Sequence, residues 1–105
     1  MKRIIVILCL VFSSLIAKGQ EIDYETIPNV PYYAKDVQAS DSYLAKRCVL
    51  DIYYPKDAKN FASIIWFHGG GLTGGEKEIP DLLKGQGVAV IGVNYRLSPE
   101  VKAPE

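Results

Sequence analysis

The chain has 105 residues, which is enough for one small domain. It is 49% hydrophobic and 23% charged, a composition typical of a globular protein and not of a disordered one. The charges of its 12 basic and 12 acidic residues cancel, and the sequence shows no basic stripe. Both features argue against a nucleic-acid partner.

The N-terminal segment, residues 1–19, has the pattern of a secretory signal peptide. Lys2 and Arg3 form a positive head, and residues 4–16 are an apolar run. Small residues then occupy the positions that signal peptidase reads, up to Gly19. The run has 13 residues, whereas a membrane span needs about 20. We therefore expect cleavage near Gly19, export to the periplasm or the extracellular space, and no stable membrane anchor.

Residues 20–105 are the expected mature chain, with nine basic and twelve acidic residues and a net charge of −3. Cys48 is its one cysteine, so no internal disulfide can form, and we expect this residue to be a small buried apolar side chain. One histidine and one cysteine do not make a metal-binding cluster, so we predict no metal and no cofactor.

The first half of the expected mature chain contains one clear strand. Residues 20–31 carry two prolines and little periodicity, which favours an irregular lead-in. Residues 32–37 are predicted as a short strand and residues 40–42 as a turn. Residues 47–55 have a period of two, which places Cys48, Leu50, Ile52 and Tyr54 on one face, and they end in a proline; this pattern predicts a strand. A hairpin between these two predicted strands is a further expectation.

The second half has the pattern of a β-α-β unit. Residues 61–67 and 88–95 are continuous apolar runs, as expected of strands buried on both faces. Twenty residues separate them, too many for a hairpin and enough for the crossover that parallel strands require. Apolar residues at helical spacing within residues 79–83 predict a short helix in that crossover, and the connection should be right-handed.

These elements predict an α/β fold that is incomplete by itself. Buried parallel strands need helices on both faces, and the sequence offers one short helix for that purpose. We therefore expect residues 20–105 to be the N-terminal part of a larger α/β domain.

A glycine-rich loop, "HGGGLTGG" (residues 68–75), follows the first of the two apolar runs. Glycine permits positive φ angles and lets other groups approach the backbone closely. Successive exposed N–H groups in such a loop form a concavity that binds anions. Ligand sites of open α/β sheets gather at the carboxyl ends of the strands, where this loop is expected to lie.

The anion could in principle belong to a nucleotide. Gly69, Gly71 and Gly74 satisfy the dinucleotide pattern G-x-G-x-x-G. The end of the next strand, however, offers Asn94 where an acidic residue would bind the ribose. A P-loop is excluded because Glu76 stands where that loop needs a lysine. A nucleotide-binding unit and a glycine-rich turn without chemistry remain the weaker alternatives.

The other candidate anion is the oxyanion of ester hydrolysis. "HGGG" after an apolar strand, followed by "VNYRLSPE" (residues 93–100) at the end of the next, resembles the HGGG-type carboxylesterase and hormone-sensitive-lipase-like branch of the α/β hydrolases. The resemblance covers about residues 45–105. It implies an α/β-hydrolase fold with short N-terminal strands, then a β-α-β unit of a mostly parallel sheet, and an enzyme that hydrolyses carboxylic esters.

The resemblance also assigns roles within the loop. It implies that the backbone N–H groups of Gly70 and Gly71 form part of the oxyanion hole. It further implies that Gly69 shapes the turn, and that His68 anchors the loop through its ring and is not the catalytic base.

The catalytic triad of such an enzyme is missing from these residues. The family needs a serine in G-x-S-x-G, then an acid, then a histidine. No serine here lies in that motif, and His68 is the one histidine. The resemblance implies that the triad lies beyond Glu105, so this chain alone should be inactive. The expected substrate is a small-molecule or polysaccharide-linked ester, and a non-catalytic binding module with the same scaffold is the alternative. The acyl and alcohol groups and the oligomeric state stay open.

Overall fold

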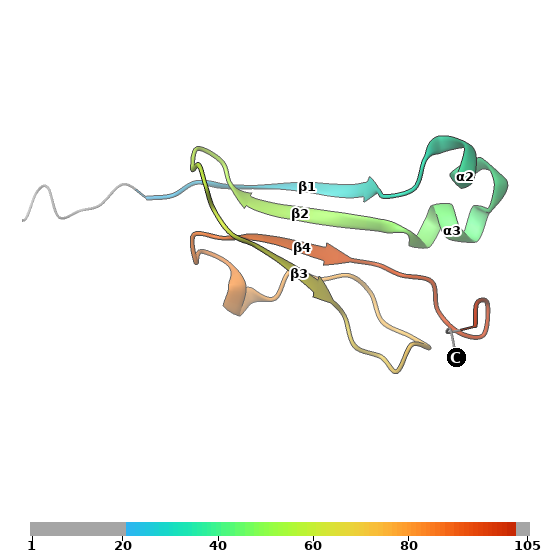
Figure 1. Cartoon of the computed structure of the whole chain (residues 1–105). Helices are drawn as coiled ribbons and strands as arrows, with labels where there is room; N and C mark the ends of the chain where they lie inside the picture. The colour runs from blue at the N-terminus through green and yellow to red at the C-terminus, as the bar shows by residue number, and fades with distance from the viewer. Residues whose placement is uncertain (1–20, 103–105) are drawn as a thin grey trace, which may run out of the picture.

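The computed structural model describes residues 21–102, so the predicted signal peptide lies outside the described residues. The described part is one four-stranded sheet with two short helices at one end (Figure 1). The elements are β1 (Tyr24–Pro31), α2 (Lys35–Ser40), α3 (Ser42–Arg47), β2 (Val49–Pro55), β3 (Ser63–Phe67), the 3-10 turn η1 (Asp81–Leu83) and β4 (Ala89–Val93).

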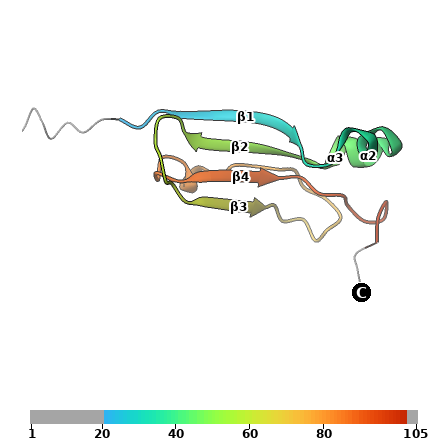
Figure 2. The ribbon, with the colours of Figure 1, turned by 45° about the horizontal axis from the view of Figure 1, so that its top comes forward.

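The strands form a mixed sheet in the order β1-β2-β4-β3. β1 pairs with β2 and β2 pairs with β4 in antiparallel orientation, whereas β3 and β4 are parallel. Figure 2 shows the four strands in one layer, with α2 and α3 beyond its end. The parallel pair that the long connection predicted is confirmed, and the mixed sheet with short helices agrees with an α/β class.

The prediction of an irregular lead-in over residues 20–31 is wrong, because β1 occupies most of that range. Its two prolines are tolerated because β1 lies at the edge of the sheet, where a missing N–H faces away from the partner strand. A bulge between Ile27 and Val30 absorbs the irregularity. There Asn29 takes a positive φ of 54° and its N–H donates to the Asp51 carboxylate at 2.9 Å.

The predicted strand over residues 32–37 and its hairpin are also wrong. α2 begins at Lys35, and the strand before the two helices that pairs with β2 in antiparallel orientation is β1. The turn predicted at residues 40–42 corresponds to the junction between α2 and α3. There Asp41 caps α3 by accepting a hydrogen bond from the Leu44 N–H at 3.0 Å.

The other three predicted strands are confirmed with shorter bounds. β2 begins only at Val49, because α3 extends to Arg47. Cys48, between them, is buried, as expected. β4 supplies much of the core, with Val90 fully buried.

The expectation that β3 is buried on both faces does not hold within the described residues. β3 lies at the edge of the sheet, and its side chains Ile65 and Phe67 are 58% and 62% exposed. No helix of the described residues covers this face, which explains why an apolar strand is left open to solvent.

The helix predicted over residues 79–83 shrinks to the single turn η1, and Leu82 is 90% exposed. The reason is a tertiary contact. A Cβ at Gly92 of β4 would overlap the Glu78 carbonyl, so the connecting segment lies directly on the strand there. The segment is therefore held on the sheet by its backbone, and a helix with an apolar face does not form there.

The rest of the connection is held by two stacked tyrosines. The rings of Tyr24 and Tyr53 are parallel, with centroids 4.7 Å apart. Their hydroxyls accept hydrogen bonds from the Gly87 N–H at 2.7 Å and the Gly85 N–H at 3.0 Å. Both glycines have positive φ, which lets the chain turn back into β4.

Candidate functional site

The glycine loop leaves β3 at its carboxyl end, and its backbone has unusual torsion angles. Gly70 has a φ of 129°, Gly71 of 62° and Leu72 of 64°. The backbone at Gly70 and Gly71 is exposed. Within residues 21–102, no atom accepts a hydrogen bond from the N–H of Gly70 or Gly71. Both donors are therefore available to a ligand.

The loop folds back on itself and is tightly packed. The Gly70 carbonyl accepts hydrogen bonds from both the backbone N–H and the hydroxyl of Thr73, each at 3.2 Å. A Cβ at Gly70 would overlap the Gly74 carbonyl, and a Cβ at Gly75 would overlap the Gly69 carbonyl. The absence of a side chain at Gly70 and Gly75 thus lets the two backbone segments of the loop touch.

His68 lies inside this loop, with 5% of its surface exposed. Its ring stacks on Tyr95, with centroids 4.3 Å apart, and its Nδ1 lies 2.8 Å from the Gly69 carbonyl. Since a carbonyl can only accept, the proton belongs on Nδ1. The Nε2 atom is buried and has no hydrogen-bond partner among the described residues. No described hydrogen bond joins the ring to a serine hydroxyl.

Tyr95 supports the loop from the end of β4, since its hydroxyl donates to the His68 carbonyl at 2.6 Å. Tyr95→Phe keeps the stacked ring and removes this bond, leaving a part-buried carbonyl without a donor. We expect the free energy of unfolding to fall by about 1–2 kcal/mol, measured by urea denaturation of the whole protein. Tyr33→Phe is the matched control, because Tyr33 is 39% exposed and its hydroxyl makes no hydrogen bond within residues 21–102. Equal losses in both variants would contradict the role of the hydroxyl.

A polar cluster fixes the segment where the loop ends. Asn94, which is 4% exposed, accepts from the Lys77 N–H at 2.6 Å and donates to Glu76 at 3.0 Å. Glu76 also accepts from Arg47 of α3 at 2.6 Å. The Lys77 ammonium pairs with Asp51 of β2 at 3.0 Å. The sequence analysis did not identify Arg47, and it used Glu76 only to exclude a P-loop. Arg47 and Glu76 are 29 residues apart, and contacts between such distant residues leave no periodic pattern in the sequence.

The cluster sets the acid response of the fold. The hydrogen bond from the Asn94 amide is the largest effect on Glu76; burial opposes it, and the charge and hydrogen bond of Arg47 add to it, so that the pKa of Glu76 lies below its usual 4.5. A carboxyl whose pKa is lower in the folded state contributes stability above its unfolded pKa and loses it as the pH falls through the folded value. We expect Glu76→Gln to remove part of the loss of stability below about pH 4.5, measured as Tm against pH. An unchanged acid limb would contradict this role.

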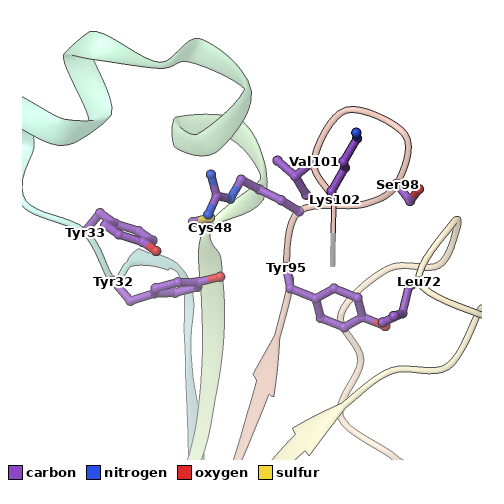
Figure 3. A pocket seen from close by; sticks show the side chains of 9 residues that line it. Tyr32, Tyr33, Cys48, Leu72, Tyr95, Ser98, Val101 and Lys102 are labelled. Atoms are coloured by element: carbon purple, nitrogen blue, oxygen red, sulfur yellow. The ribbon is translucent and has the colours of Figure 1, made fainter. Parts of the chain in front are cut away.

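A cavity of about 360 Å³ opens beside the loop (Figure 3). Tyr32 lines it, and its hydroxyl donates to the Asn94 carbonyl at 2.7 Å. Burial, followed by the neighbouring Cys48, raises the pKa of this tyrosine. Leu72 of the glycine loop forms part of the wall, so the cavity adjoins the open amides. Further lining residues labelled in Figure 3 are Tyr33, Cys48, Tyr95, Ser98, Val101 and Lys102.

Within residues 21–102, no group of three or more His, Cys, Asp or Glu side chains is placed to hold a metal ion. Over the same range, none of the helices has the length and apolar character needed to cross a bilayer.

Comparison with known proteins places the chain in a family. The family model of BD-FAE, an α/β-hydrolase-like esterase family, matches residues 50–105. Acetylcholinesterase 4 of Caenorhabditis briggsae is 30% identical over 77 residues, which are 68% of this chain and 13% of that protein. The chain thus spans about 13% of the length of this curated relative. No solved structure matches significantly. The hormone-sensitive-lipase-like branch stays a prediction, but the chain belongs to the BD-FAE family and, through it, to the α/β-hydrolase superfamily.

Proposed function

We propose that this chain supplies the oxyanion-hole loop of an exported serine hydrolase that cleaves carboxylic esters. One observation carries the proposal. Gly70 and Gly71 are exposed after the carboxyl end of β3, and their N–H groups have no acceptor within residues 21–102. An esterase family and a relative named as an acetylcholinesterase support an ester as the substrate class.

The proposed chemistry is acyl transfer to a serine. When the serine oxygen attacks the ester carbonyl, negative charge develops on the carbonyl oxygen, and the two amides donate to it. Because packing around His68 already fixes the loop, the donors need little reorganisation when the charge appears. Removing one such donor typically lowers kcat by about 10²–10³. The serine, its base and the acid would come from outside residues 21–102.

The proposed architecture continues the sheet beyond β3. The outer edge of β3 carries no strand within the described residues, and Ile65 and Phe67 are exposed on one face. An unpaired edge and an open apolar face are what the N-terminal part of an α/β-hydrolase sheet would show before further strands and helices cover it.

The remaining expectations belong to the same proposal. Export would follow cleavage near Gly19, and the reaction would need no cofactor, since backbone amides stabilise the charge. The cavity beside Leu72 would hold one of the two groups of a small-molecule or polysaccharide-linked ester.

The test compares the whole protein with the 105-residue chain, using p-nitrophenyl acetate. We expect the whole protein to hydrolyse it and to lose activity on labelling by a fluorophosphonate, which reacts with activated serines. The 105-residue chain should not exceed the uncatalysed rate. A whole protein that neither turns over esters nor takes the label would be a non-catalytic binding module, and the proposal would fail.

A further inference from the structure

We propose that Arg47 is a positioning residue for the oxyanion loop. Its guanidinium group, carried by α3, fixes Gly75 and Tyr95, the two residues that support His68. It thereby sets the direction of the amides of Gly70 and Gly71. The inference rests on the proposed function, and it assigns a role to a residue far from the loop in sequence.

The guanidinium of Arg47 is buried and bound on three sides. The residue is 7% exposed. Its Nε donates to the Tyr95 carbonyl at 3.1 Å, its Nη1 to the Glu76 carboxylate at 2.6 Å, and its Nη2 to the Gly75 carbonyl at 3.1 Å. A buried charge is tolerated only when its donors are engaged, so the three acceptors and the arginine hold each other in place.

The first support is the backbone at Gly75. A Cβ there would overlap both the Gly69 carbonyl and the His68 ring, so Gly75 lies directly against the start of the loop. The Gly74 carbonyl lies in the same way against Gly70. Close packing without intervening side chains transmits displacement, and a shift of Gly75 would therefore shift Gly70.

The second support is Tyr95. Arg47 holds the carbonyl of this residue, while its ring stacks on His68 and its hydroxyl donates to the His68 carbonyl. The loop is thus held from Gly75 on one side and from Tyr95 on the other, and Arg47 bonds to both.

Lysine should not replace this arginine. The three acceptors lie around a planar fork, whereas an ammonium group is a compact point charge that lacks the fork geometry. Glu76 contributes the counter-charge, and its second oxygen is held by the Asn94 amide at 3.0 Å. Its side chain is 74% exposed, so Glu76→Gln is a milder perturbation of the same cluster.

The first measurement follows amide hydrogen exchange in the whole protein. The reporter is the Thr73 N–H, which donates to the Gly70 carbonyl and is not a hydrogen-bond partner of Arg47. In Arg47→Lys we expect this amide to exchange about tenfold faster, since bonds to a charged group are lost, while the amides of β4 keep their rates. Lys84→Met is the control, because it removes one positive charge from an exposed pair with Asp81.

The second measurement separates positioning from general stability. In Arg47→Lys we expect kcat for p-nitrophenyl acetate to fall about tenfold with KM nearly unchanged, because the amides act mainly in the transition state. Affinity for a trifluoromethyl ketone, which forms an oxyanion on the enzyme, should fall in parallel. Affinity for the matching methyl ketone should stay constant. Equal weakening of both ketones would overturn the proposal.

The two proposals fail in different ways. If the wild-type protein hydrolyses no ester, the proposed function fails, and exchange at Thr73 still decides whether Arg47 orders the loop. If Arg47→Lys and Glu76→Gln both leave that exchange at the wild-type rate, Arg47 is not a positioning residue, whatever the activity. Should Arg47→Lys not fold, faster exchange confined to the loop in Glu76→Gln supports the proposal, and unchanged exchange overturns it.

Discussion

Replacement of Gly70 by alanine should lower kcat for ester hydrolysis by the whole protein by about 10²–10³, the usual cost of losing one oxyanion donor. Two features of this position combine. Its φ of 129° is a conformation that residues with a side chain rarely adopt, and the new Cβ would overlap the Gly74 carbonyl. The backbone must move, and its N–H then turns away from the reacting oxygen.

Two further variants divide the effect into its causes. Gly71 has a positive φ of 62°, but a Cβ at this position would meet open space. We therefore expect a smaller loss of kcat in Gly71→Ala than in Gly70→Ala. Gly85 also has a positive φ, of 74°, and open space for a Cβ, but it lies at the far end of the connection between β3 and β4. Gly85→Ala should therefore leave kcat unchanged. If Gly85→Ala matched Gly70→Ala in steady-state kinetics, the loss would reflect general destabilisation and the oxyanion assignment would be wrong.

The second large effect is expected at Gly92, in the middle of β4. Gly92→Ala should lower the free energy of unfolding by about 1–3 kcal/mol, the usual cost of overpacking. The added methyl group would overlap the Glu78 carbonyl and push the connecting segment off the sheet. The same displacement would strain the Lys77–Asp51 ion pair and the cluster around Asn94.

Urea denaturation of the whole protein measures this loss, with Gly74→Ala as the control. A Cβ at Gly74 meets nothing within 4 Å and its φ is not in the left-handed region, so the midpoint should change little. A Gly92→Ala variant as stable as wild type would show that the connection does not pack on β4 as described.

Prediction from the sequence succeeded where the signal was local and repeated. The period of two over residues 47–55 and the continuous apolar runs at residues 61–67 and 88–95 are properties of neighbouring residues, and each segment contains a strand. The glycine loop was identifiable for the same reason, since glycine adopts positive φ angles at little steric cost and a cluster of glycines is visible in the local sequence. The length of the connection alone was enough to predict parallel pairing of β3 and β4.

Prediction failed where a distant partner decided the outcome. β1 looked irregular because two prolines and a bulge hide its pattern, and only pairing with β2 makes it a strand. The helix predicted over residues 79–83 is only a single turn, because Glu78 packs on Gly92. Local helix propensity does not predict such a contact.

The sequence by itself thus determined the chemistry that the backbone can offer, because glycine spacing and strand patterns act over a few residues. The tertiary structure alone decided how that backbone is held. Arg47, Glu76 and Asn94 lie far apart in the chain and meet only when α3, the loop exit and the end of β4 come together. Hydrogen bonds between such residues depend on distance in space, and separation along the sequence carries no information about them.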